Sequence, residues 1–288
     1  MSLKNDTFGF TRYWLVTALA KLPVQPELFS KKCLSQARKA FLAGDNQLKA
    51  IKNWLSHSAL VEAGRGTTTL TELGKLISAK DPGAEQAWTW WLFHLHLCAN
   101  TDSFPYAAYF TKFDAEGTSW VSFSDIVDKL NQCQPDPAAP VERSTVESYF
   151  QGVEQTFRSG MPIHGLGLVE RRQIANEEGR ERFRRSLSHP PDVVVAYATL
   201  LFHATFFSNE QTVETRRLLE KGLARGLGVR DQQFRDALSR IHQHHDLGQL
   251  IQFRRAVNLD SVQFARAGEP ALRSLSILGY DSGEVRWP

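Results

Sequence analysis

The chain has 288 residues, of which 42% are hydrophobic, and a formal net charge of +3. This composition supports a buried core and excludes a disordered or generally polycationic protein, so any contact with nucleic acid requires a local basic patch. The three cysteines, Cys33, Cys98 and Cys133, form no CxxC pair, which excludes a disulfide framework and a zinc finger. The first 14 residues lack a charged region followed by an apolar one, so we expect no secretory signal, and the longest apolar run, 87–99, is shorter than a membrane span. We therefore expect a cytoplasmic protein that has no membrane partner.

The first part of the chain predicts three helices and a hairpin. Residues 10–22 and 29–42 are apolar enough for two helices, and prolines follow the first of them. A third helix starts at Asn46, because Leu48, Ile51 and Leu55 recur at helical spacing. Residues 59–62 and 67–70 then predict two strands joined by a turn at 64–66, and a further helix starts at Thr71.

This order of elements is typical of a winged helix, with Arg65 at the tip of the wing. The outer stripe of the third helix carries Asn46, Lys49, Ala50 and Asn53, which are side-chain types that contact phosphates and base edges. Residues 28–53 carry six Lys or Arg residues against one Asp, and such a patch suits phosphate neutralisation. We predict that duplex DNA binds to this module, through Asn46, Gln47, Lys49, Lys52, Asn53 and Arg65. A winged helix used only for packing is the alternative.

The middle of the chain predicts a buried hub. Residues 88–97 are apolar nearly all round, which indicates a central helix, and the aromatic-rich stretch 104–113 is expected to pack on it. Residues 132–141 are rich in proline and have no periodicity. We take them as a linker between a domain at 1–131 and a domain at 142–288, although a long exposed loop would look the same.

The second half predicts further helix and hairpin units. Residues 144–157 form a helix followed by a strand pattern at 165–170, and the exposed face of that helix is expected to carry Glu147, Gln151, Glu154 and Gln155, which would repel phosphates. The charged stretch 171–185 is read as a solvated helix, with a DNA-backbone contact as the alternative. A third set follows at 193–257. The fold class is therefore mainly α with short β-hairpins, in which winged-helix-like units surround a buried helical core. The pattern of helices followed by a hairpin occurs three times, but the sequences of the three units do not form an exact repeat.

Few residues point to catalysis. The sequence has no P-loop, GxSxG, HExxH or dinucleotide fingerprint, which argues against those enzyme classes. Hydrolysis of a phosphodiester needs groups that hold Mg²⁺ or Mn²⁺, and Asp81, Glu85 and His94 around the hub are weak candidates. Alternatively, Asp81 is a helix cap, Glu85 is a solvated surface group and His94 is a hydrogen-bonded core histidine. The cluster from His242 to Asp246 is more typical of a helix end than of a metal site.

Six stretches of the chain carry a family resemblance. They are TFGFTRYWLVTAL, GDNQLKAIKNWLSHSALVE, LTELGKLI, DPGAEQAWTWWLFHLHLCAN, STVESYFQGVEQTF and HGLGLVE, in this order. The chain thereby resembles the domain-of-unknown-function family encoded in bacterial DNA phosphorothioation clusters, which is represented by the SspB-type DNA nickase. The residues that match its helix motif are Gly44, Asn46 and Trp54, and those that match its Trp-Leu-Leu-His pattern are Trp91, Leu92 and His94.

Two positions depart from the family pattern. Asn5 stands where the family usually has His before Glu-Thr-Phe, which leaves no such His for chemistry. Asp45 stands where the family often has Lys after the glycine turn, which weakens a phosphate contact at the start of the helix.

The resemblance implies a phage-defence protein that acts on DNA. It would introduce or direct a single-strand nick so that sulfur can replace a phosphate oxygen, and it would use Mg²⁺ or Mn²⁺ if it cleaves. The implied partners are double-stranded DNA, the ATPase and the ATP pyrophosphatase of the same cluster, and a cysteine desulfurase that supplies sulfur. A non-catalytic DNA-binding adaptor that recruits these enzymes is the alternative. A winged-helix transcriptional regulator ranks last, because the chain shows no dimerisation helix.

Overall fold

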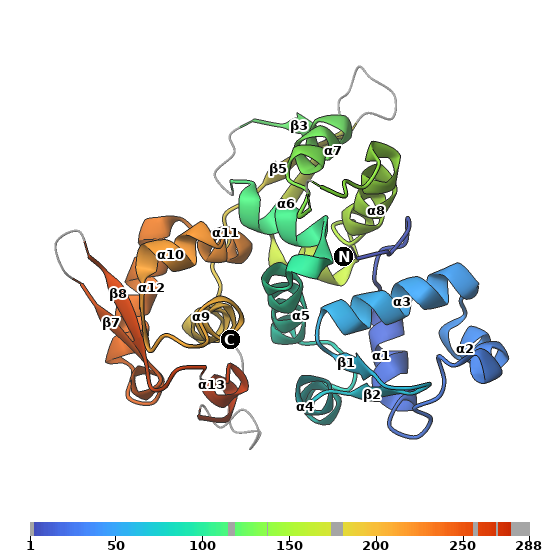
Figure 1. Cartoon of the computed structure of the whole chain (residues 1–288), viewed down its shortest axis with the longest axis horizontal. Helices are drawn as coiled ribbons and strands as arrows, with labels where there is room; N and C mark the ends of the chain where they lie inside the picture. Colours follow the sequence, from blue (N-terminus) through green and yellow to red (C-terminus); the bar gives the residue numbers. More distant parts are fainter. Residues whose placement is uncertain are drawn as a thin grey trace. The chain divides into compact units, whose positions relative to one another are not determined.

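The computed structural model describes residues 3–114, 119–136, 138–173, 181–255, 259–268 and 270–277. It divides into two compact units, each built from two stretches of the chain (Figure 1). Unit 1 comprises residues 1–109 and 118–184, and unit 2 comprises residues 110–117 and 185–288. This division differs from the predicted split into 1–131 and 142–288, because the helices on either side of the proline-rich segment pack on each other within unit 1.

Unit 1 begins with the predicted three helices and hairpin. Their bounds are α1 (Arg12–Lys21), η1 (Lys31–Cys33), α2 (Leu34–Phe41), α3 (Asp45–His57), β1 (Val61–Ala63), β2 (Thr68–Leu70) and α4 (Glu72–Lys80). Thr11 and Thr71 cap α1 and α4 by accepting backbone N–H bonds in the first turn. The two strands are antiparallel and pair Val61 with Leu70. The sequence therefore located each of these elements to within a few residues.

The predicted hub is α5 (Ala87–Ala99), followed by η2 (Thr101–Ser103) and α6 (Tyr106–Lys112). The side chains of α5 are buried almost throughout, as expected for a helix that is apolar all round. Phe93 stacks on Phe10 with ring centroids 4.9 Å apart and on Trp54 at 6.2 Å, and Trp54 meets Tyr106 edge to face. This aromatic cluster ties α3 to the hub, so the orientation of α3 is fixed by packing.

The rest of unit 1 is a second helical pair with a small sheet. Its elements are β3 (Val121–Ser122), α7 (Phe123–Gln132), α8 (Arg143–Gln155), η3 (Pro162–Leu166), β4 (Val169–Gln173) and β5 (Glu181–Arg185). The strands lie in the order β3-β5-β4. The charged stretch 171–185 was expected to be a helix, and this was wrong for its described parts, which are strands. Phe183 is buried while its neighbours are partly exposed, which is the alternation of a strand.

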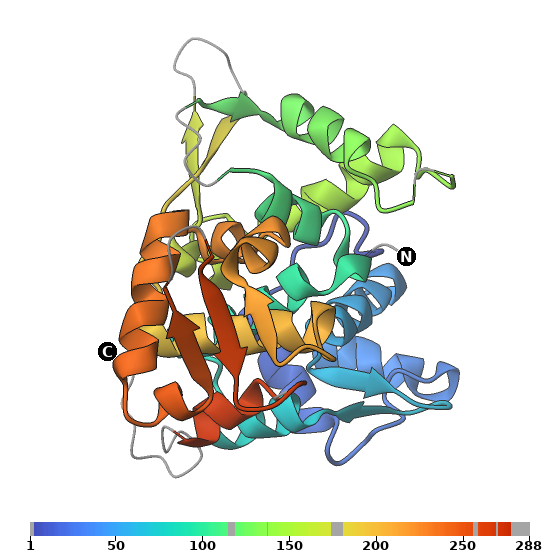
Figure 2. The same cartoon turned by 60° about the vertical axis from the view of Figure 1, so that its left-hand side comes forward.

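Unit 2 repeats this plan around another buried helix. Its elements are α9 (Asp192–Phe206), β6 (Thr212–Glu214), α10 (Thr215–Glu220), α11 (Leu223–Leu227), α12 (Asp231–Gln243), η4 (Leu247–Gln249), β7 (Ile251–Arg254), β8 (Ser261–Phe264) and α13 (Leu272–Ile277). The strands lie in the order β6-β8-β7, and Figure 2 shows this sheet in orange and red. Within the described residues, no helix has both the length and the apolarity to cross a membrane.

The two three-stranded sheets share one connectivity. In each sheet, the strand that precedes the helices (β3 or β6) pairs with the last strand (β5 or β8). The last strand also pairs with the strand just before it in sequence (β4 or β7). In the N-terminal part, the N–H of Thr68 in β2 donates to the carbonyl of Pro26 at 2.7 Å, so the segment before α2 lies where the other sheets place their first strand. The fold is thus mainly helical with small antiparallel sheets, and one arrangement of elements recurs along it.

Candidate nucleic-acid interface

The α3 helix is held so that one side stays open to solvent. Gly44 precedes the helix with extended backbone, and its N–H donates to Oε1 of Gln47 at 2.9 Å. The side chains of Leu48, Ile51, Trp54 and Leu55 are buried, and the indole N–H of Trp54 donates to the carbonyl of Phe8 at 2.9 Å. The opposite side of α3 is therefore the surface on which a ligand can act.

The predicted DNA-binding residues differ in how free they are. Asn46 and Lys49 are exposed, with the Lys49 ammonium donating to Oδ1 of Asn46 at 3.4 Å, and Lys52 is half-buried one turn further on. Gln47 serves the start of the helix, and the Asn53 amide donates to the carbonyl of Lys4 at 2.8 Å. Arg65 is exposed in the turn between β1 and β2.

One residue of the predicted outer stripe is not on the surface. Ala50 is 1% exposed, because it lies one turn before the buried Trp54 on the same side of α3. The open face of α3 is consequently narrower than the helical spacing of the sequence predicted. It contains Asn46, Lys49 and Lys52.

Further cations lie on the elements that precede α3. Lys31, Lys32 and Lys39 are exposed on η1 and α2, and α2 packs against α3. Within the described part of the chain, these three residues together with Lys49 and Lys52 form no ion pair with a carboxylate. Such lysines are available to phosphates, since no ion pair has to be broken first.

Arg38 is the exception among these cations. Its Nε and Nη2 atoms donate to the two carboxylate oxygens of Asp45, each at 2.6 Å, in a bidentate pair. The pair lowers the pKa of the Asp45 carboxyl, chiefly through the hydrogen bonds from Arg38, and raises the pKa of Arg38. Asp45 is therefore a carboxylate at neutral pH.

Two of the three catalytic candidates around the hub, Asp81 and His94, have structural duties. Oδ1 of Asp81 accepts the N–H of Glu85 at 2.9 Å, and Oδ2 accepts the N–H of Gln86 at 3.0 Å and the hydroxyl of Thr89 at 2.6 Å. This carboxylate joins the turn before α5 to Thr89 in the first turn of the helix, and it is 5% exposed. His94 is fully buried, with its Nδ1 2.7 Å from the hydroxyl of Tyr106.

Glu85 differs, because it lines a cavity of about 370 Å³ in unit 1. Its Oε1 accepts from Nη2 of Arg12 at 2.5 Å, and Nε of the same arginine donates to the carbonyl of Gly83 at 2.7 Å. Trp90 and His164 also line the cavity. Arg12 and His164 were not singled out from the sequence, because they are distant from Glu85 along the chain and only the fold brings the three together.

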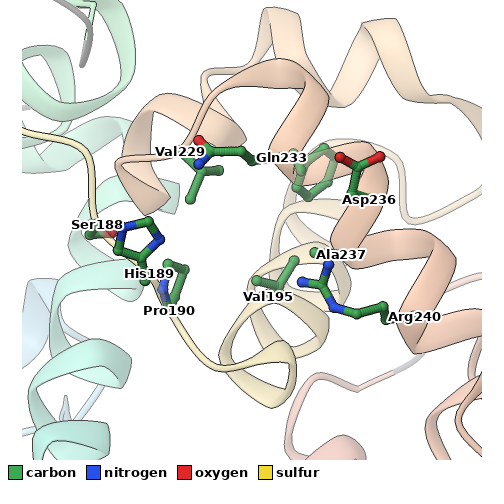
Figure 3. A pocket seen from close by; sticks show the side chains of 10 residues that line it. Ser188, His189, Pro190, Val195, Val229, Gln233, Asp236, Ala237 and Arg240 are labelled. Carbon is green, nitrogen blue, oxygen red and sulfur yellow. The ribbon is translucent and has the colours of Figure 1, made fainter.

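Unit 2 has a second cavity, of about 250 Å³. Figure 3 shows His189 and Pro190 on one side of it and Asp236 and Arg240 of α12 on the other. The guanidinium of Arg240 is held by both carboxylate oxygens of Asp192, at 2.9 and 2.7 Å. Arg240 thus gives this cavity a cationic side chain whose charge is already neutralised by Asp192.

No group of three or more His, Cys, Asp or Glu side chains among the described residues is arranged to hold a metal ion. In the sequence cluster near residue 244, Nδ1 of His244 accepts the N–H groups of Asp246 and Leu247, at 3.2 and 3.4 Å, and so belongs to the end of α12. The candidates Asp81 and Glu85 have their oxygens engaged by N–H, hydroxyl and guanidinium donors. These residues do not fit a Mg²⁺ site as they stand.

Asn5, at the first departure from the family pattern, is also structural. It is fully buried, and its amide donates to the carbonyl of Tyr149 in α8 at 3.0 Å. The close approach needs Gly152, since a Cβ there would lie 2.2 Å from the Asn5 amide nitrogen. Asn5 therefore fastens the N-terminal segment to α8 inside unit 1.

Comparison with known proteins supports the resemblance. Two crystal structures of SspB have the same fold, each with a TM-score of 0.72 and each matching 98% of this chain and 88% of its own. The sequence identities are 19% for the first and 20% for the second, which is described as magnesium ion-bound. No curated protein sequence matches the chain significantly. A family model described as a protein of unknown function, DUF4007, matches residues 4–277, and the chain therefore belongs to the DUF4007 family.

Proposed function

We propose that this chain binds duplex DNA within a bacterial DNA phosphorothioation system used in phage defence. The observation that carries the proposal is the open face of α3, where Asn46, Lys49 and Lys52 lie beside lysines of η1 and α2 that have no carboxylate partner among the described residues. The fold shared with SspB and the DUF4007 family supports the assignment to a phosphorothioation system. The ATPase and the ATP pyrophosphatase of such a system are the proposed protein partners.

The arrangement of elements suits a winged helix that reads the major groove. An α-helix fits that groove, and an exposed Asn such as Asn46 is suited to contact a base edge while Lys49 and Lys52 contact phosphates. The hairpin β1–β2 follows α3 directly and packs on it, so it would serve as the wing, with Arg65 reaching the backbone beside the groove. Gln47 and Asn53 belong to the same proposed DNA-binding set, and their amides also support the chain around α3.

The proposed consequence of binding is a single-strand nick, which the protein introduces with Mg²⁺ or Mn²⁺ or directs in another subunit. The structure neighbour described as magnesium ion-bound SspB supports including the metal in the test. The adaptor, which binds DNA and recruits the modification enzymes, is favoured by a specific observation. Both oxygens of Asp81 are engaged by the turn before α5 and by the Thr89 hydroxyl, and His94 is fully buried.

Charge reversal on α3 tests DNA binding. In a fluorescence anisotropy titration with a labelled duplex, Lys49→Glu and Lys52→Glu are each expected to weaken binding roughly tenfold and to lower the salt slope by about one. Lys129→Glu is the matched control, because Lys129 is exposed on α7 in the same unit. An equal loss of DNA affinity with all three variants, or no loss with any of them, would contradict the proposal that α3 binds DNA.

Nicking is tested on supercoiled plasmid with Mg²⁺, with Mn²⁺ and with EDTA. Metal-dependent open circles that are lost with Lys49→Glu support the nickase. Binding without open circles supports the adaptor, and a repeat with the purified partner subunits then shows whether the nick is directed in trans.

A further inference from the structure

Asp45 is the only carboxylate between Leu28 and Asn53, and it lies in the first turn of α3. The N-terminus of a helix attracts anions, because its free N–H groups and the helix dipole present partial positive charge. On a helix that binds DNA, this end is a natural place for a backbone phosphate. Here the chain itself supplies a carboxylate in that first turn, and Arg38 binds it.

The partners of Asp45 are the groups that a phosphate would use. Arg38 gives it two parallel N–H···O bonds of 2.6 Å, and the guanidinium fork suits a phosphate as well as a carboxylate. Lys49 also acts electrostatically on Asp45, from one turn further along α3. The Arg38 and Asp45 side chains are 52% and 48% exposed, so a phosphate in solution can reach the pair.

We propose that Asp45 is an internal competitor of DNA, which holds Arg38 in the free protein and releases it to a backbone phosphate on binding. This inference rests on the proposed DNA-binding function and deepens it. An exposed ion pair is weak, so replacing the Asp45 carboxylate by a phosphate on Arg38 costs little free energy. The result is a surface whose affinity for DNA of any sequence is lower than its lysine content implies, which leaves more of the discrimination to base contacts such as those of Asn46.

A double-mutant cycle tests the competition. The proteins are the wild type, Asp45→Asn, Arg38→Gln and the double variant, each titrated with one labelled duplex over a series of NaCl concentrations. Asp45→Asn is expected to tighten binding five- to tenfold and to steepen the salt slope by about one, because Arg38 becomes free for a phosphate. In the Arg38→Gln background, the same substitution is expected to tighten binding by less than twofold.

Glu220→Gln is the matched control. Glu220 pairs with Arg216 on α10 in unit 2, both side chains are exposed, and the substitution changes the formal charge by the same amount as Asp45→Asn. It is expected to leave DNA affinity within twofold of the wild type.

Each outcome bears on the inference separately from the proposed function. If Asp45→Asn tightens binding equally with and without Arg38, the effect is a general one of net charge and the competition is overturned. If the wild type binds DNA and Asp45→Asn does not change its affinity, the competition is likewise overturned while the function stands. If none of the proteins binds DNA, the proposed function fails and the inference fails with it.

Discussion

Asp81 illustrates how a carboxylate offered by the sequence for catalysis serves a helix instead. Its two oxygens accept two backbone N–H groups and the Thr89 hydroxyl at the start of α5. Asp81→Ala leaves these donors, of which the Thr89 hydroxyl is buried, without an acceptor, so it is expected to cost about 2 kcal/mol of unfolding free energy. Urea denaturation followed by circular dichroism measures the loss.

Asp81→Asn is the conservative comparison, because its amide oxygen can still accept some of these bonds, and it is expected to lose less than Asp81→Ala. DNA affinity of both variants at a temperature where they are folded should equal that of the wild type. Unchanged stability combined with loss of plasmid nicking would return Asp81 to the list of catalytic residues.

The residues of the DNA face were predictable in part. Helical periodicity places Asn46 and Lys49 on the side opposite Leu48 and Ile51, and the structure agrees. Periodicity does not reveal that Asn53 bonds to the carbonyl of Lys4, since that partner comes from the N-terminal segment and depends on the tertiary fold. The assignment of DNA itself to these residues stays a prediction.

At the scale of elements, α3 and α8 hold corresponding places and present different surfaces. Both helices come before a hairpin, but the exposed residues of α8 include Glu147 and Gln151, whereas those of α3 include Asn46 and Lys49. Glu154 was expected on this face and is instead 4% exposed, because it pairs with Arg171 at 2.7 Å inside unit 1. The two helices therefore differ in charge although the elements around them match.

Gln151→Glu on α8 is accordingly expected to leave DNA affinity unchanged, since no phosphate contact is assigned to α8. Lys49→Glu on α3 is the positive comparison, with its roughly tenfold loss. Anisotropy titrations under the same salt conditions measure both. A loss with Gln151→Glu comparable to that with Lys49→Glu would show that both helices contact DNA.

Elements with regular apolar patterns were easier to predict than charged ones. The hairpin β1–β2 was located from a turn flanked by β-branched residues, whereas β5 and the end of β4, residues 171–173, were taken for a helix. Their guanidinium groups can pack on aromatic rings, as that of Arg184 does 4.9 Å from the centroid of the Trp120 ring. A residue that looks solvated in the sequence can thus form one face of a sheet.

At the scale of the whole molecule, the recurring helix and hairpin pattern was visible in the sequence, but the two compact units were not. Residues 110–117 belong with the C-terminal half and 118–184 with the N-terminal half. A proline-rich segment is a sound indicator of a loop, yet Arg143 just beyond it bonds to Asp128 before it at 2.8 Å. Only the pairing of distant segments decides which stretches share a core.

Both units contain a histidine that the fold keeps neutral, which predicts how stability depends on pH. Burial lowers the pKa of His57 and lowers that of His96 to about 4 in unit 1, and it lowers the pKa of His203 in unit 2. As pH falls, the unfolded chain takes up protons near the ordinary histidine pKa of 6.5 before the folded chain does. Protons then favour unfolding, so stability present at pH 8 is lost as the pH approaches 5.

Calorimetric melting between pH 8 and pH 5 measures this loss. Carboxyls whose pKa is lowered by an arginine, such as Glu210 beside Arg217, lose their contribution only at more acid pH, so they do not account for it. His203→Gln retains a donor for the carbonyl of Glu210 and removes the titrating ring, so its melting temperature is expected to fall less steeply with acid than that of the wild type. His242→Gln, exposed on α12, is the control and should follow the wild-type slope. Identical slopes for all three proteins would mean that protonation of His203 is not coupled to the folding of unit 2.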